Sequence, residues 1–245
     1  MNDTYSYKES VSVEEAKLIL AEYKKTLPED HNEFVRKQLE YEYISVTRTI
    51  TIGEQTFTGT FREAKDRKKK KNAYRKESKI AAVLASKGFD IVLLKEEDKP
   101  AHLNSRNNSQ RNTKPDALVN CVVMDFKEII GNSKNTLGNN YQDAMKKNNT
   151  YGAVMFVVKD ISEKDVFNQL AGKTRSQGNG IVLVYHENKD ALQIINMKNL
   201  RAAHERTARI GMASANNANP HNELGAKSQS NLNINLSENS VNKKQ

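Results

Sequence analysis

A chain of 245 residues with a formal net charge of +9 is long enough for one ordinary domain with appendages, and its basic excess favours a polyanionic partner over a neutral small molecule. The single cysteine, Cys121, excludes an internal disulfide framework and fits the reducing cytoplasm. No segment approaches the roughly 18 apolar residues that a membrane span requires, so we expect a soluble protein without a membrane partner.

The first 61 residues predict a small accessory unit. Residues 12–47 indicate two helices, with a capping-box pattern at Ser12-Val-Glu-Glu15 and a break at Pro28. Residues 47–61 alternate like two strands around Gly53, which predicts a hairpin. These residues contain no motif with an evident chemistry, so the functional domain is expected at residues 62–212.

That domain predicts a mixed β-sheet flanked by helices, in the α/β class. Its expected elements, in chain order, are a helix over 62–87, a strand over 89–94, strands near 117–119 and 122–129, a helix near 138–148, a strand over 151–158, a helix over 162–173 and strands near 180–185 and 192–197. The order is therefore αβββαβ with an αββ extension. Residues 213–245 contain nine asparagines and no aromatic side chain, which predicts a disordered tail.

Two acids are expected to face each other in the hairpin of residues 117–129. If Asn120 and Cys121 form a two-residue turn, Asp116 stands opposite Asp125. Like charges that face each other across a ladder are destabilising and persist most readily around a cation. Strand alternation also places Lys127 on the same face as Asp125. An ordinary surface hairpin with an Asp and Lys pair remains the alternative.

A third acid, Glu77, is expected on the core-facing stripe of the preceding helix. Two or three carboxylates with open coordination positions suit Mg²⁺ or Mn²⁺. Metal-bound water can lose a proton near neutral pH, and a neighbouring lysine can help to prepare it for attack on a phosphodiester. Glu77, Asp116 and Asp125 are therefore candidate metal ligands, and Lys127 joins them as a candidate catalytic residue.

This pattern resembles the PD-(D/E)xK nuclease superfamily of restriction-endonuclease-like folds. The resemblance rests on Pro115-Asp116 followed by Asp125-Phe126-Lys127, with Glu77 on the preceding helix. It implies an αβββαβ core, a divalent metal held by the three acids, and a lysine that serves the attacking water. It also implies a polar contribution from the following helix, for which Gln142 and Lys146 are candidates.

The run from Lys114 to Asn120, followed by Asp125 to Ile129, is similar to the tRNA-cleaving toxin domains of bacterial contact-dependent growth inhibition proteins and of related phage and mobile-element proteins. The resemblance covers roughly residues 74–205. It implies RNA, and tRNA in particular, as the substrate in preference to DNA. It also implies action in the cytoplasm of a target cell and a possible immunity protein as a partner.

Basic side chains are expected to contact the nucleic-acid backbone, although a solvated surface is the alternative at each place. Beside Gln142 and Lys146, the candidates are Lys68, Lys69, Lys70, Lys71, Arg75, Lys173, Arg175 and Arg201. Two other functions stay open. One is a metal-independent ribonuclease that uses His186 or His204 as acid or base, and the other is a non-catalytic nucleic-acid-binding protein of a mobile element.

Overall fold

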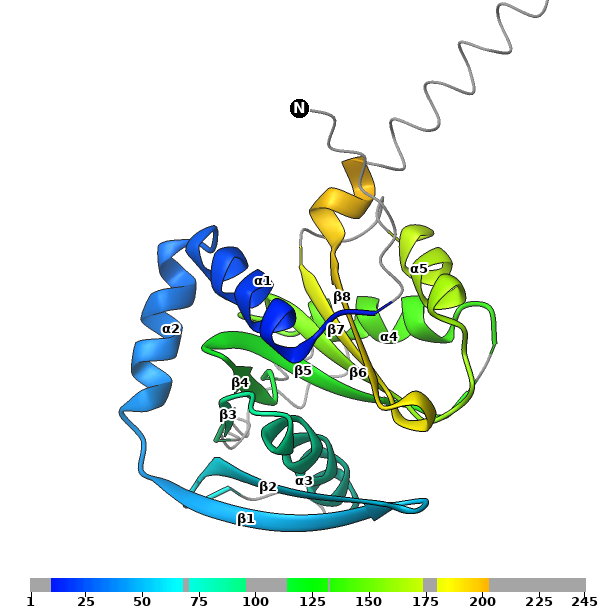
Figure 1. Cartoon of the computed structure of the whole chain (residues 1–245). Coiled ribbons are helices and arrows are strands. Elements are labelled where there is room, and N and C mark those ends of the chain that lie inside the picture. Colours follow the sequence, from blue (N-terminus) through cyan, green and yellow to red (C-terminus); the bar gives the residue numbers. More distant parts are fainter. Residues whose placement is uncertain (1–9, 68–70, 96–113, 132, 174–179, 203–245) are drawn as a thin grey trace, which may run out of the picture. The chain divides into compact units, whose positions relative to one another are not determined.

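The computed structural model of the chain describes residues 10–67, 71–95, 114–131, 133–173 and 180–202. Eight strands form one sheet in sequential order, flanked by helices (Figure 1), which confirms the predicted class. The elements are α1 (Val13–Lys25), α2 (Glu29–Leu39), β1 (Tyr43–Ile52), β2 (Gln55–Ala64), α3 (Lys71–Ser86), β3 (Ile91–Leu93), β4 (Ala117–Val119), β5 (Val122–Ile129), α4 (Thr136–Met145), β6 (Gly152–Val157), α5 (Glu163–Ala171), β7 (Ile181–His186) and β8 (Ala191–Asn196).

The sheet is mixed because hairpins and helical crossovers alternate along the chain. Antiparallel pairs join β1 to β2, β3 to β4, β4 to β5 and β7 to β8. Parallel pairs join β2 to β3, β5 to β6 and β6 to β7, with α3, α4 and α5 as the respective crossovers. The segment from α3 to β6 therefore runs in the predicted αβββαβ order.

The hairpin of β4 and β5 has the predicted turn and register. Asn120 and Cys121 have φ angles of 48° and 63°, and a tight two-residue turn of this kind requires positive φ at both central residues. The Asn120 side chain accepts a hydrogen bond from the backbone N–H of Asp90 at 2.8 Å, which ties the turn to the start of the β3 region. Ala117 pairs with Met124, and Val119 with Val122.

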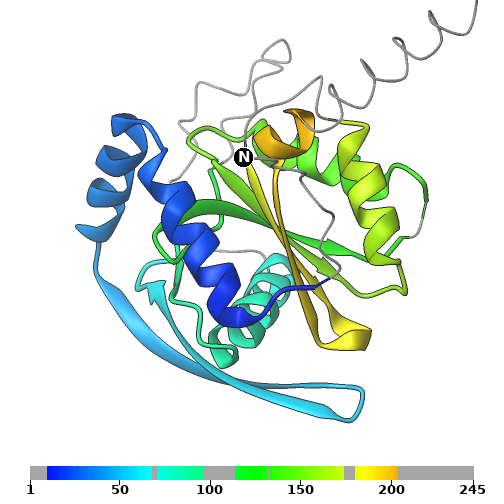
Figure 2. The ribbon, with the colours of Figure 1, turned by 45° about the horizontal axis from the view of Figure 1, so that its top comes forward.

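The N-terminal hairpin belongs to the same sheet as the rest of the domain. Strand β2 runs through Ala64 and pairs with β3 through Arg62 and Val92, so the boundary expected after residue 61 falls inside a strand. The helix expected from Arg62 begins only at Lys71, because the alternating burial of β2 continues past residue 61. Figure 2 shows this long, curved hairpin beside α3. The predicted tail, residues 213–245, lies outside the described residues.

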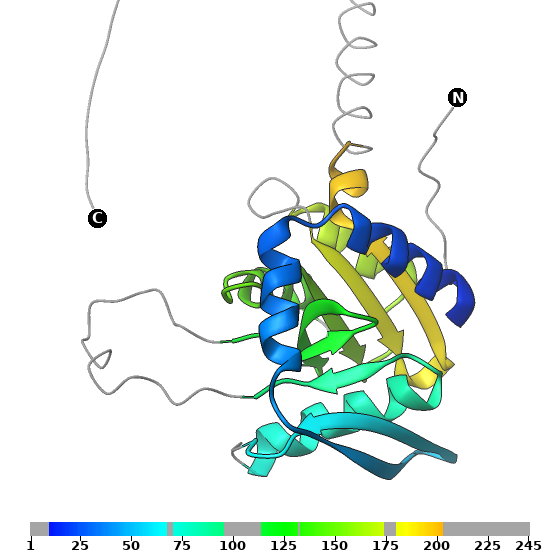
Figure 3. The same cartoon turned by 90° about the vertical axis from the view of Figure 1, so that its left-hand side faces the viewer.

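Each face of the sheet is covered by its own helices. Met124 and Phe126 belong to a hydrophobic cluster with side chains of α3 and α1, whereas Ala153 and Met155 pack with α4 and α5 on the other face. Figure 3 shows α1 lying across β7 and β8. Among the described residues, none of the helices combines the length and the apolar character needed to cross a lipid bilayer.

Helix α3 lies very close to β2, and Gly59 permits this approach. A Cβ atom at Gly59 would lie 2.0 Å from the carbonyl oxygen of Ala82 and 2.8 Å from the backbone nitrogen of Ser86. Backbone atoms cannot move aside as a flexible side chain can, so only glycine fits here. This contact fixes the position of α3, which carries several candidate functional residues, against the hairpin.

Candidate active site

Asp116 and Asp125 lie side by side on the hairpin of β4 and β5. The backbone N–H of Asp116 donates to the carbonyl oxygen of Met124 at 3.2 Å. Its side-chain Oδ2 accepts the backbone N–H of Phe126 at 2.9 Å. Asp116 is thus held from two sides immediately before β4, at the level of Asp125 on the neighbouring strand.

Lys147 joins the two carboxylates. It follows the C-terminal cap of α4, where its backbone N–H donates to the carbonyl oxygen of Ala144 at 3.1 Å. Its Nζ lies 3.3 Å from Asp116 Oδ1 and contacts Asp125 Oδ1 directly. Lys147 is not among the residues predicted from the sequence, because its approach to the acids depends on how α4 packs on the sheet.

Lys127 completes the group from the same face of β5. Its Nζ lies 2.9 Å from Asp125 Oδ2, and strand alternation had predicted this common face. The contact is an ion pair without hydrogen-bond geometry. We refer to these four residues as the carboxylate–lysine cluster. The exposed fractions of the side chains are 0% for Asp125, 11% for Asp116, 16% for Lys147 and 22% for Lys127.

The burial of the cluster alters its protonation. Removal of Asp125 from water, together with the adjacent Asp116 carboxylate, raises the pKa of Asp125 to about 7. Burial alone would lower the pKa of Lys147, but the two carboxylates outweigh burial and raise it. Lys147 is therefore a permanent cation at neutral pH, whereas Asp125 changes charge near neutrality.

Glu77 is buried on α3, where its carboxylate contacts the buried guanidinium of Arg67. Helix α3 packs on the sheet face that carries Met124 and Phe126, and Asp125 points to the other face. Within the described residues, no group of three His, Cys, Asp or Glu side chains is arranged to hold a metal ion. The structure thus brings Asp116, Asp125 and Lys127 together but does not assemble the expected three-carboxylate shell.

The donor chemistry of the two aspartates nevertheless suits a hard divalent cation. Both carboxylates are held beside each other by backbone and lysine contacts, and a cationic group, the Lys147 ammonium, already bridges them. Mg²⁺ is commonly bound through one or two carboxylates and keeps several waters. Asp116 and Asp125 are therefore the residues that could hold it, with Lys147 moving from its bridging position.

Among the described residues, the side chains expected to contact nucleic acid are dispersed over the surface rather than gathered at the carboxylate–lysine cluster. Arg75 and Lys71 are exposed on the first turns of α3, and Lys146 is exposed on α4, where it pairs with Asp143 at 3.0 Å. Gln142 and Lys173 are partly buried, and Arg201 is exposed. Lys68, Lys69, Lys70 and Arg175 lie outside the described residues.

His186 is a buried residue at the end of β7. Its Nε2 lies 3.2 Å from Gln193 Oε1, and the Gln193 amide donates to the backbone carbonyl of Glu163 at 3.3 Å. Burial lowers the pKa of His186, which keeps the ring neutral. These contacts indicate that His186 has a structural role, with its ring held between β7 and β8. The other candidate, His204, lies outside the described residues.

No model of a known protein family matches the chain, and no curated protein matches it. A solved chain from the CdiA-CT/CdiI toxin and immunity complex from Burkholderia pseudomallei is similar to 52% of this chain and 89% of its own length. The two are 19% identical, with a TM-score of 0.39. A similarity of this extent carries no argument about activity, so the functional conclusion depends on the site.

Proposed function

We propose that the chain is a metal-dependent nuclease with the carboxylate–lysine cluster as its active site. The observation that carries the proposal is the burial of Asp125 beside a second carboxylate, Asp116, with two lysines in contact. Burying two like charges together is costly, and such arrangements concentrate at sites where the perturbed charges perform chemistry. The resemblance of the hairpin motif to PD-(D/E)xK nucleases supports the same conclusion.

In this proposal Lys147 acts as a permanent positive charge. Because its pKa is raised, it stays protonated and can donate a hydrogen bond to a phosphate oxygen as negative charge develops there. Lys127, on the more exposed side of Asp125, orients the attacking water. The water oxygen forms a bond to phosphorus as it gives up a proton to solvent, the P–O ester bond breaks, and the departing oxygen takes up a proton from solvent.

Asp116 and Asp125 would hold Mg²⁺ or Mn²⁺, and Glu77, which lies on the opposite face of the sheet in contact with Arg67, is not among the proposed ligands. When bound, the metal would supply positive charge that stabilises the transition state and would lower the pKa of a coordinated water. Asp125 must lose its proton to serve as a ligand. Because burial raises its pKa to about 7, metal binding and proton release are coupled near neutral pH.

We propose RNA, and tRNA in particular, as the substrate, and a toxin-like role with an immunity protein as partner. This part of the proposal rests on the motif that runs from Lys114 through Ile129. The burial of His186 disfavours its use as an acid or base in a metal-independent reaction. A non-catalytic nucleic-acid-binding role is the second candidate, because the chain has a formal net charge of +9.

The proposal is tested by incubating the purified full chain with tRNA, other RNA and DNA in the presence of Mg²⁺ or Mn²⁺. Cleavage should require the metal and stop in EDTA. The variants Asp125→Asn and Lys147→Gln should each lose activity by about 100-fold or more, because each removes charge stabilisation at the reacting group. The matched control is Lys25→Gln, which removes one exposed charge from α1.

Melting curves of all variants establish that they are folded before rates are compared. The proposal fails if the wild-type chain cleaves none of the three substrates with either metal, or if Asp125→Asn cleaves as well as wild type. Cleavage that survives EDTA but is lost in His186→Gln would instead establish the metal-independent reaction. Salt-sensitive binding without cleavage would establish the non-catalytic role.

A further inference from the structure

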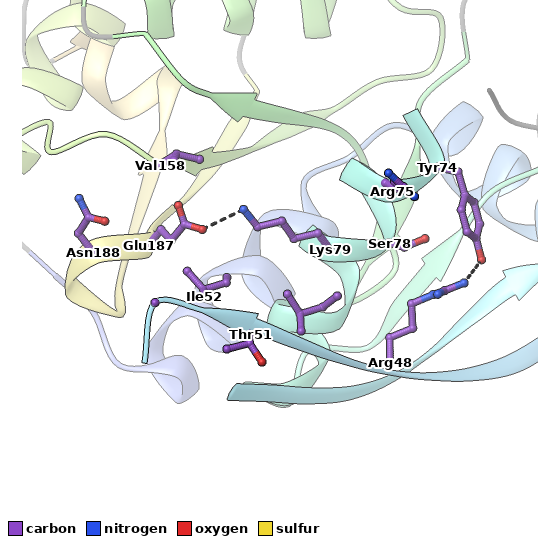
Figure 4. A pocket seen from close by; sticks show the side chains of 12 residues that line it. Arg48, Thr51, Ile52, Tyr74, Arg75, Ser78, Lys79, Val158, Glu187 and Asn188 are labelled. Atoms are coloured by element: carbon purple, nitrogen blue, oxygen red, sulfur yellow. Dashed lines mark hydrogen bonds and ion pairs between the residues drawn. The ribbon is translucent and has the colours of Figure 1, made fainter. Parts of the chain in front are cut away.

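A pocket of about 640 Å³ lies between the hairpin of β1 and β2, the first turns of α3 and the segments that follow β6 and β7. Figure 4 shows its lining, in which Arg48, Tyr74, Arg75, Ser78 and Lys79 are contributed by the hairpin and α3. Helix α3 covers the sheet face opposite Asp125, so this pocket is separate from the carboxylate–lysine cluster.

The position of the pocket is typical of ligand sites in α/β sheets. Val158 comes directly after β6 and Glu187 directly after β7, and both line the pocket. The strands β5, β6 and β7 are parallel, so their carboxyl ends meet at one edge. Ligands of open α/β sheets commonly bind beyond the carboxyl ends of such strands.

The lining carries an excess of positive charge. Three cations, Arg48, Arg75 and Lys79, stand against one carboxylate, Glu187, which leaves an excess of two. Lys79 is partly neutralised, because its Nζ lies 2.9 Å from Glu187 and 3.4 Å from Glu128. Arg75 is exposed, and no acidic side chain in the described part of the chain forms an ion pair with it. The pocket therefore offers an available guanidinium to an anion.

Arg48 is already held in place. Its guanidinium carbon lies 5.0 Å from the centre of the Tyr74 ring, and one of its N–H groups donates to the Tyr74 hydroxyl. That hydroxyl lies 3.3 Å from a carboxylate oxygen of Glu63. An arginine fixed by stacking and hydrogen bonding loses little conformational entropy when it binds a ligand.

Two buried donors in the pocket have no hydrogen-bond partner among the described residues: Ser78 Oγ and Arg48 Nε. Ser78 is 3% exposed and lines the pocket, and Figure 4 shows its hydroxyl on the side of Tyr74. Buried polar groups are normally hydrogen-bonded, and an unsatisfied group is costly. An anion beside Arg48 and Arg75 would accept from both groups.

We infer that this pocket binds a phosphate group of a nucleic-acid strand, at a distance from the proposed site of cleavage. The guanidiniums of Arg48 and Arg75 and the hydroxyl of Ser78 supply donors that suit phosphate oxygens. The choice of nucleic acid as the source of that phosphate rests on the proposed function. The pocket would add affinity and position a substrate long enough to reach both faces of the domain.

The test measures equilibrium binding of the full chain to a fluorescein-labelled single-stranded RNA by anisotropy, in EDTA so that cleavage does not intervene. Arg75→Gln should weaken binding roughly tenfold and lower the slope of log affinity against log salt by about one. Ser78→Ala should weaken binding about threefold while leaving the melting temperature unchanged or higher, because it removes an unsatisfied buried hydroxyl. Lys25→Gln is the matched surface control.

The inference is overturned if the wild-type chain does not bind RNA, or if Arg75→Gln and Ser78→Ala bind as tightly as the Lys25→Gln control. Binding of inorganic phosphate with no binding of RNA would also overturn it. The result is separable from cleavage. Loss of binding in Arg75→Gln without any nuclease activity in wild type would uphold the pocket and defeat the proposed reaction. Nuclease activity in wild type with unchanged binding in Arg75→Gln would defeat the pocket alone.

Discussion

Lys147 Nζ contacts Asp125 Oδ1 directly, and this interaction ties α4 to the middle of β5. The same ammonium group lies 3.3 Å from Asp116 Oδ1, so one cation compensates two buried carboxylates. Each member of the cluster therefore affects the protonation and the stability of the others.

Replacing Lys147 with methionine should destabilise the protein by about 3 kcal/mol, because it leaves two buried carboxylates short of a cation. The exposed Lys25→Met variant should change the free energy of unfolding by less than about 0.5 kcal/mol. Urea unfolding at pH 8 measures both values. Adding Asp125→Asn to Lys147→Met should recover part of the loss, and strictly additive effects would contradict the proposed coupling.

Asp125 should titrate near neutrality in the metal-free protein. Its pKa is raised from 3.8 to about 7, so the folded state binds the proton more tightly than the unfolded state. The contribution of Asp125 to stability therefore falls as pH rises between about 4 and about 7, and is constant above that range. Lys147 does not contribute to this pH dependence of stability, because its raised pKa keeps it protonated across the same pH range. Carbon-detected NMR of the Asp125 carboxyl group measures the midpoint, and a midpoint near 4 would refute the prediction.

Binding of Mg²⁺ should strengthen as pH rises to about 7 and then level off, because Asp125 must be deprotonated to serve as a ligand. Below that pH, affinity should fall by about tenfold per pH unit. Calorimetric titrations at pH 6 and pH 8 measure the difference. Asp116→Asn should abolish the binding, whereas Asp143→Asn, an exposed acid on α4, should not. Equal affinity at both pH values would argue against Asp125 as a ligand.

Gly59→Ala should destabilise the fold by about 3 kcal/mol or more, because the new Cβ would lie 2.0 Å from the Ala82 carbonyl oxygen and would push α3 from β2. Gly172→Ala is the control, since its Cβ would meet backbone oxygens only at 3.7 Å and 3.8 Å. Thermal melting of the two variants is the measurement. If Gly59→Ala melts at the wild-type temperature, the contact between α3 and β2 is looser than described.

Local sequence patterns were sufficient to predict the three members of the carboxylate–lysine cluster that lie on the hairpin of β4 and β5. The turn at Asn120 and Cys121 sets the register, so the adjacency of Asp116 and Asp125 and the common face of Lys127 follow from short-range rules. Lys147 was not predictable in this way, because a 22-residue separation from Asp125 is closed only by the packing of α4 on β5 and β6.

The contrast between local patterns and long-range packing also explains the other differences between the predicted and the observed elements. The strands were found with small shifts at their ends, because apolar runs bounded by turn residues are local signals. The helix before β3 was predicted to begin too early, since Arg62 to Ala64 continue a strand whose pairing partner, β3, lies about 30 residues further along the chain. The contact of Glu77 with Arg67 likewise joins a helical residue to one outside the helix, which helical periodicity alone does not predict.

The parallel pairing of β2 with β3 bears on how the domain can be cut into fragments. A fragment that begins at residue 65 would lose all of β1 and β2, leaving β3 as an open sheet edge with unpaired backbone groups. It would also uncover apolar side chains of α3 that pack on Phe57 and Phe61. Open edges beside exposed apolar surface promote self-association. Such a fragment would be expected to aggregate even though it retains all four residues of the carboxylate–lysine cluster.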